Sequence, residues 1–145
     1  MRLSVAAMAM LAAASLSACG GLLGRGGDSG SYDIGTNRTT YNRGNVGEAT
    51  IRNTSDKTLE YNLCQRRLER QVDRSWITAF EWPTADSACT TEARSLARGQ
   101  SVNVFFDIPT GVPAGTYRVV FIGLLGEDGR AISGDRAATP SFEVR

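Results

Sequence analysis

Histidine is absent from the 145 residues of this chain. Without it, Ser–His and Cys–His nucleophilic pairs cannot form, and the commonest zinc ligand is missing. Lysine is nearly absent as well, because Lys57 is the single lysine and arginine carries the remaining positive charge. These absences predict a protein that is not an enzyme and that holds no metal and no other cofactor.

Paired carboxylates are the acid–base candidates that remain, namely Glu81 with Asp86 and Glu127 with Asp128. Asp128 is followed by Gly129, however, and this dipeptide is typical of a hairpin turn. Glu81 is expected in a loop. The acidic residues also lack the spacing of a calcium-binding EF-hand loop. We therefore expect neither catalysis nor calcium binding from them.

Long apolar runs are scarce, and the clearest one stands at the start of the chain. Residues 3–16 carry no charge and follow the single basic residue Arg2. A membrane-spanning helix needs about 20 apolar residues, and this run is shorter and ends in small side chains. That is the pattern of an export leader removed by cleavage. Residues 1–18 are therefore predicted to be a signal peptide.

The run closes on Leu16, Ser17, Ala18 and Cys19. These four residues resemble the cleavage motif of bacterial lipoproteins, and the alternative is an ordinary secretory leader followed by a chance cysteine. The resemblance implies cleavage before Cys19, a diacylglycerol on its sulfur and a fatty acyl group such as palmitate on its amine. Several acyl chains make a stable membrane anchor. Gly20 in place of aspartate implies the outer membrane, on its periplasmic or cell-surface face.

Residues 19–36 are rich in glycine, with serine, arginine and aspartate. No apolar period in this segment could bury a face, so it is predicted to be a flexible tether. A Gly-rich chain of this length reaches about 20–25 Å. The tether would let the following domain stand clear of the lipid headgroups.

Residues 37–145 are enough for one compact domain with a core of its own. Loss of Arg2 with the leader would leave 15 of the 16 basic side chains against 15 acidic ones. This balance argues against a nucleic-acid partner, which usually selects a basic patch. The expected partners are the membrane, through the lipid on Cys19, and another envelope or extracellular protein or a glycan.

Two cysteines remain once Cys19 is modified, Cys64 and Cys89. In an exported protein they predict a disulfide, and the alternative is two free buried thiols. The bridge would close a loop of about 26 residues and contribute roughly 3–4 kcal/mol in the chain-entropy model.

Apolar residues recur at every second position through the domain, with turn residues between the runs. The predicted strands are 46–53, 59–63, 68–72, 76–77, 101–106, 117–122 and 141–145. Turns are expected at 53–57 and 73–75, where polar side chains can bond to the backbone. Helix signals are weak. About seven short strands predict an all-β fold, an antiparallel β-sandwich.

A turn at 113–116 ends in Tyr117 at the head of a predicted strand. Sandwich domains place their tyrosine corner at such a point, where the phenol bonds back to the upstream backbone. Tyr117 is therefore predicted to fix the crossing between two sheets.

The order of short motifs in this domain resembles that of bacterial immunoglobulin-like domains of exported proteins. The motifs are Asn53-Thr54-Ser55, Tyr61, Trp76, Cys89, Leu96-Ala97-Arg98-Gly99 and Gly115-Thr116-Tyr117-Arg118. The resemblance implies an immunoglobulin-like β-sandwich that serves as a non-catalytic binding or structural module. The same segment is also similar to bacterial proteinase inhibitors of immunoglobulin-like fold, which gives inhibition as the alternative function. The short cysteine spacing departs from antibody-type domains, so the bridge is expected to join a mid-domain strand to the loop before 101–106.

Aromatic residues gather between the two cysteines. Trp76 is expected in the core, whereas Phe80 and Trp82, followed by Pro83, are expected in a long connection that ends at Cys89. Tryptophan combines a large apolar area with a hydrogen-bond donor and dominates binding hot spots. Phe80, Trp82 and Pro83 are therefore the candidate binding loop, for a protein, a peptide or a sugar.

Overall fold

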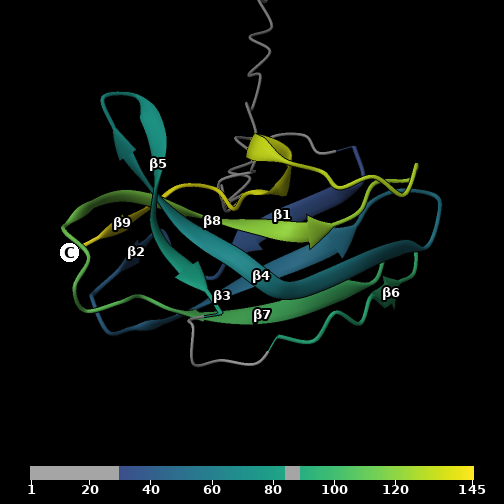
Figure 1. Cartoon of the computed structure of the whole chain (residues 1–145), viewed down its shortest axis with the longest axis horizontal. Helices are drawn as coiled ribbons and strands as arrows, with labels where there is room; N and C mark the ends of the chain where they lie inside the picture. Colours follow the sequence, from purple (N-terminus) through teal and green to yellow (C-terminus); the bar gives the residue numbers. More distant parts are fainter. Residues whose placement is uncertain (1–29, 84–88) are drawn as a thin grey trace, which may run out of the picture.

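The computed structural model describes residues 30–83 and 89–145, and this part of the chain is all-β. Its nine strands form two sheets in two layers, and one short 3₁₀ helix, η1 (Gly134–Ala137), lies between β8 and β9 in the chain (Figure 1). No helix in these two ranges is long and apolar enough to cross a membrane. The predicted signal peptide, Cys19 and most of the predicted tether lie outside the described residues.

The smaller sheet contains three antiparallel strands. They are β1 (Tyr32–Thr36), β3 (Val46–Asn53) and β7 (Ser101–Asp107), with β3 in the centre. Strand β3 has the bounds predicted from its alternation. Within β3, Ile51 lies opposite Ile34 on one side and Val102 on the other.

Strand β1 corrects the predicted domain boundary. The sequence assigns residues 19–36 to a tether, but the last five of them form β1 and pair with β3. Tyr32 and Ile34 are buried in the core, whereas Asp33 between them is exposed. The period-two alternation of a strand is therefore present, although the neighbouring glycines and serines hide it.

The larger sheet contains six strands. They are β2 (Thr40–Tyr41), β9 (Phe142–Val144), β8 (Gly115–Leu124), β4 (Leu59–Val72) and β5 (Ser75–Trp82) in that spatial order, with β6 (Arg94–Leu96) paired to the first part of β4. The pairing of β2 with β9 is parallel, and the other pairings are antiparallel. The sequence predicts about seven strands, and β1, β2 and β6 are the ones it misses.

Strand β4 replaces two shorter strands expected at 59–63 and 68–72. Its register against β8 shifts between Asn62 and Arg66, and this irregularity interrupts the alternation of apolar residues. Gly123 of β8 lies against the shift, where a Cβ atom would stand 2.1 Å from the backbone oxygen of Asn62. A side chain at this position would therefore force the two strands apart.

Strands β4 and β5 form a hairpin that stands out from the rest of the domain (Figure 1). Its two turn residues, Asp73 and Arg74, both have positive φ, at 48° and 67°. This backbone suits a type I′ turn, whose twist matches that of the paired strands. The turn lies within the predicted connection 73–75, and β5 continues well beyond the predicted residues 76–77.

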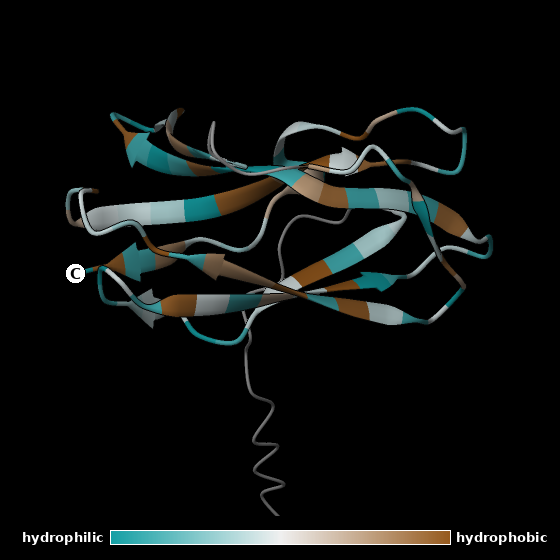
Figure 2. Ribbon diagram, turned by 60° about the horizontal axis from the view of Figure 1, so that its bottom comes forward, coloured by the Kyte–Doolittle hydropathy of each residue, from teal (hydrophilic) through white to brown (hydrophobic). Residues whose placement is uncertain are grey.

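The buried apolar residues of both sheets form one core cluster. Figure 2 shows the two sheets as two layers, with hydrophobic positions spaced along their strands. Three aromatic rings pack together at one end of the core cluster: Tyr41 lies 5.0 Å from Phe142 and 5.7 Å from Phe106, measured between ring centroids. The ring of Tyr117 is also buried, and its hydroxyl donates a hydrogen bond to the backbone oxygen of Pro113 at 2.6 Å. This bond runs four residues back along the chain.

Tyr32 makes the stability of the domain sensitive to alkaline pH. Its hydroxyl donates to the backbone oxygens of Leu125 at 2.9 Å and Glu60 at 3.2 Å, and burial raises the pKa of Tyr32 to about 12. A phenol in the unfolded chain ionises near pH 10. The contribution of Tyr32 is therefore constant below pH 10 and is lost as the pH rises from about 10 to about 12.

We expect the free energy of unfolding to fall over this range, and to fall less steeply in a Tyr32→Phe variant. Urea unfolding at several pH values between 8 and 11.5 measures both slopes. Equal slopes for the two proteins would show that Tyr32 does not resist ionisation in the fold.

Candidate functional site

The candidate binding residues lie on a strand rather than in a loop. Phe80 and Trp82 belong to β5, opposite Leu68 and Arg66 of β4, and Pro83 follows directly after the strand. The two rings are half-buried against the core, with their centroids 5.1 Å apart. The predicted loop is therefore wrong at its start, where Phe80 and Trp82 still belong to the strand. Their spacing of two residues is the period of a strand, and it could have indicated this in the sequence. Residues 84–88, including Asp86, lie outside the described chain.

Arg66 joins this aromatic pair to the smaller sheet. Its guanidinium lies 5.3 Å from the Trp82 ring centroid, in the range of a cation–π contact. It donates hydrogen bonds to the backbone oxygens of Leu63 at 3.1 Å and Phe105 at 3.2 Å. Burial lowers the pKa of Arg66, and the negative charge of Asp107 opposes that shift. Arg66 thus connects the inner side of β4 to the edge strand β7.

These residues form one side of the domain, between the edge strands β5 and β7, that we call the open flank. Its members are Leu63, Arg66, Phe80, Trp82, Val102 and Val104. Except for Arg66 they are apolar side chains that are partly buried against the core. All of them stand on strands, so the surface is held in place by the sheets.

A disulfide holds the connection that follows β5. Cys64 of β4 is bonded to Cys89, and their Cα atoms lie 5.6 Å apart. The bridge joins a mid-domain strand to the connection before β7, as expected. Asn62 also fixes the segment after Cys89, because its Nδ2 donates hydrogen bonds to the backbone oxygens of Thr90 at 2.7 Å and Glu92 at 3.1 Å. The sequence analysis missed Asn62, although its position two residues before a cysteine is visible in the chain.

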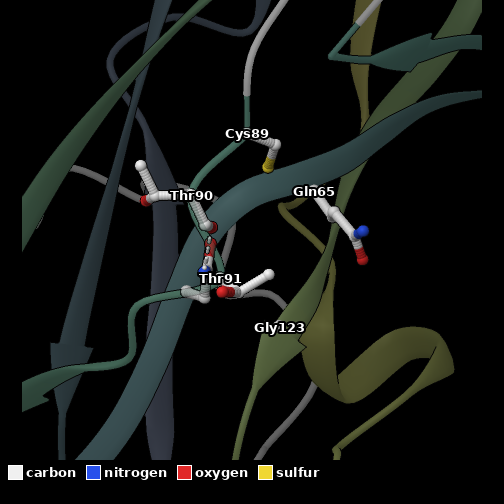
Figure 3. Close-up of a pocket in the computed structure, with 6 residues that line it drawn as sticks. Gln65, Cys89, Thr90, Thr91 and Gly123 are labelled. Carbon is white, nitrogen blue, oxygen red and sulfur yellow. Dashed lines mark hydrogen bonds between the residues drawn. The ribbon is translucent and has the colours of Figure 1, made fainter.

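Two hollows of about 230 Å³ each lie beside this tethered segment. The first is lined by Asn62, Gln65, Cys89, Thr90, Thr91 and Gly123 (Figure 3). The second opens toward the flank, and its lining includes Leu63, Glu92, Arg94, Val102 and Val104. Both are smaller than most ligand pockets, which measure about 300–1,000 Å³. Neither brings two acidic side chains together for acid–base chemistry.

Trp76 lies outside the core in which it was expected. It sits on the outer side of the larger sheet, where the guanidinium of Arg118 lies 4.3 Å from its ring centroid. Beneath this contact Glu69, only 4% exposed, accepts hydrogen bonds from Arg67 at 2.7 Å and Arg118 at 2.8 Å. Arg118 also pairs with Asp135 of η1. We call these five residues the outer charge cluster.

Of the four carboxylates considered for catalysis, Asp86 lies outside the described residues, and the other three have the following surroundings. Glu81 is exposed on β5 opposite Arg67. Glu127 forms an ion pair with Lys57 at 3.4 Å, in the connection that follows β8. Asp128 accepts a hydrogen bond from the backbone of Arg130 at 3.1 Å in the same connection, at the predicted turn. Within the described ranges, no group of three or more His, Cys, Asp or Glu residues could hold a metal ion.

Comparison with known proteins places this chain in no family. No family model and no curated protein matches the sequence. Among solved structures, Spo0M, a sporulation control protein from Bacillus subtilis, is 10% identical with a TM-score of 0.45, over 79% of this chain and 48% of that chain. The Pseudomonas fluorescens alkylpurine DNA glycosylase AlkC is 14% identical with a TM-score of 0.40, over 76% and 28%.

The ASH / PapD-like domain of human CEP192 is 14% identical with a TM-score of 0.32, and the match covers 99% of this chain and 94% of that one. This chain thus spans about half the length of the Spo0M chain and little more than a quarter of the AlkC chain.

Proposed function

We propose that this chain is an envelope lipoprotein, anchored through lipid on Cys19, whose immunoglobulin-like β-sandwich is a non-catalytic binding module. The leader motif that ends in Cys19 supports the anchor, and Gly20 supports the outer membrane. The two-layer all-β domain and its disulfide are in keeping with an exported module. The single observation that carries the binding role is the open flank.

The open flank has the composition and the rigidity of a recognition surface. Tryptophan and arginine are the residue types most enriched in binding hot spots, and here Arg66 lies over the ring of Trp82. A surface already ordered by sheet hydrogen bonds loses little conformational entropy on binding. The flank would therefore suit another envelope or extracellular protein, or a glycan whose rings stack on Trp82.

The alternative of a proteinase inhibitor needs an exposed loop in extended backbone, which a protease could accept as a substrate strand. The prominent exposed turn between β4 and β5 has both Asp73 and Arg74 at positive φ, which is far from an extended conformation. This turn therefore does not supply such a loop. The binding module stands first because of the open flank, and inhibition remains the alternative.

The two tryptophans of β5 provide a matched test of the open flank. Trp82 faces the flank and Trp76 faces the opposite side of the same strand. Crosslinking and pull-down from intact cells that produce the full-length chain should capture a partner with the wild type and with Trp76→Ala. Capture should fall at least tenfold with Trp82→Ala, because the aromatic surface and its contact with the guanidinium of Arg66 are lost together.

Purified variants must melt within a few degrees of the wild type for this comparison to hold. Equal capture by all three proteins, or capture by none, would contradict the assignment of binding to the open flank.

A further inference from the structure

Strand β5 ends the larger sheet with an unusually bare edge. Within the described chain it pairs with β4 alone, and at eight residues it is the longest edge strand. Natural proteins protect such edges with charged side chains, especially lysine, with proline, with very short strands or with β-bulges, because an exposed edge can pair with another strand. Of these devices β5 has a single bulge, between Thr78 and Phe80. Strand β5 contains no lysine, arginine or proline, and Glu81 is its single charged residue.

A bulge sets which side of the sheet each residue of β5 faces. Glu69 lies opposite Thr78 and Leu68 lies opposite Phe80, so Ala79 is the extra residue. In such a bulge two residues of one strand oppose one residue of the other, so Thr78 and Ala79 share a side. The inner side of the strand therefore holds Ser75, Ile77, Phe80 and Trp82, and the outer side holds Trp76, Thr78, Ala79 and Glu81.

The sequence of inner and outer positions along β5 is the same from its first residue to its last as from its last to its first. It is symmetric about the peptide between Thr78 and Ala79. Two antiparallel copies of β5 related by a two-fold axis would therefore match inner with inner and outer with outer along all eight residues. Closed two-fold pairing of this kind is the commonest form of homo-oligomer.

We propose that two copies of this chain pair through their β5 edges, antiparallel, so that their larger sheets become one continuous sheet. The register places Thr78 opposite the partner's Ala79 and Ile77 opposite the partner's Phe80. The hairpin that carries β5 projects from the domain (Figure 1), and within the described residues no strand other than β4 pairs with it.

Side-chain chemistry selects a second copy over an unrelated strand. Ile77 is 49% exposed in the single chain, and the partner's Phe80 would cover it. On the outer side Glu81 would lie opposite the partner's Trp76 and diagonal to the partner's Arg74, at about 7–8 Å between Cα atoms. The one negative charge of the strand would thus meet the positive charge at the tip of the partner's hairpin, and the two-fold axis makes this contact twice.

The proposal concerns the backbone edge of β5, whereas the proposed function concerns the side chains of the open flank. Each can therefore fail without the other. Pairing through β5 would also place the open flanks of two copies side by side, which would double the recognition surface.

Site-directed disulfide crosslinking tests the register in cells that produce two differently tagged full-length copies. One copy carries Thr78→Cys and the other carries Ala79→Cys, both at exposed positions. Directly opposed residues of an antiparallel pair have Cβ atoms about 4.5–5.5 Å apart, close enough for a disulfide. We expect a crosslinked species that contains both tags and disappears on reduction.

The matched control pairs Thr78→Cys with Ser75→Cys, which is also exposed but lies four positions from the predicted partner of Thr78. Its crosslink should be at least tenfold weaker. A second control adds Ile77→Lys to both crosslinking copies, where the introduced charge should abolish the product. The proposal is overturned if the Thr78 and Ala79 pair gives no more product than the Ser75 control, or if Thr78→Cys crosslinks to a different protein instead.

Wild-type copies provide an independent measurement that needs no new cysteine. Pull-down of one tag should recover the other, and Ile77→Lys in both copies should reduce the recovery at least tenfold. Recovery that is absent in the wild type, or unchanged in the variant, also overturns the pairing.

Discussion

Replacing Glu69 with alanine is expected to lower the free energy of unfolding by about 4 kcal/mol, as is typical when one partner of a buried ion pair is removed. The Glu69 carboxylate accepts hydrogen bonds from Arg67 and Arg118, and Arg118 is itself only 8% exposed. Without Glu69, the buried Arg118 keeps Asp135 as its one carboxylate and loses the partner on its Nε atom. The loss arises because the buried guanidinium keeps only one of its two carboxylate partners and its Nε–H group is left without an acceptor.

Urea unfolding measures this change, and Arg98→Ala is its control. The ion pair between Arg98 and Asp56 has the same 2.8 Å separation as the pair between Glu69 and Arg118, but its two side chains are 72% and 81% exposed. Breaking such an exposed pair should change the stability by less than about 1 kcal/mol. Similar small losses for both variants would mean that burial does not strengthen the role of Glu69.

Replacing Asn53 with alanine should destabilise the domain by about 4 kcal/mol, because it leaves several buried polar groups without partners. Asn53 is fully buried at the end of β3. Its Nδ2 donates to the backbone oxygens of Lys57 at 2.7 Å and Leu96 at 2.8 Å. Its Oδ1 accepts from both the backbone nitrogen and the hydroxyl of Ser55. One side chain thus fixes the turn after β3 and joins it to β6.

Thr54→Ala is the neighbouring control, since Thr54 is exposed and should contribute little. Both variants can be compared with the wild type by urea or thermal unfolding. A loss below about 1 kcal/mol for Asn53→Ala would show that water replaces the four hydrogen bonds, and that the turn does not depend on them.

Strands whose apolar residues alternate without interruption could be predicted from the sequence, and β3 is the clearest of them. The failures have physical causes that lie outside the local pattern. Strand β4 appears as two strands because its register against β8 shifts after Asn62. Strand β1 is missed because Tyr32 and Ile34 are buried only through their pairing with β3, which is distant in the chain.

Two residues of the open flank, Phe80 and Trp82, could be singled out from the sequence, but its other members and its geometry could not. Phe80 and Trp82 were singled out from composition, yet their placement depends on the register of β5 against β4 and on the bulge at Ala79. Trp76 was expected in the core because large rings usually are, and the buried Glu69 and Arg118 hold it outside instead. Neither placement can be inferred from the residues that are adjacent in the sequence, since each depends on pairing between strands.

The position of the disulfide also bears on how quickly the smaller sheet can be assembled. Ile51 and Val102 pair across the centre of the smaller sheet, so their contact must close a long loop. Cys64 lies 13 residues after Ile51, and Cys89 lies 13 residues before Val102, so the bridge shortens this loop by about half. Halving a loop lowers the entropy cost of its closure by about 0.6 kcal/mol. A chain oxidised early would therefore reach its native topology faster than a reduced one, which would shorten the time during which its apolar core residues are exposed to other unfolded chains.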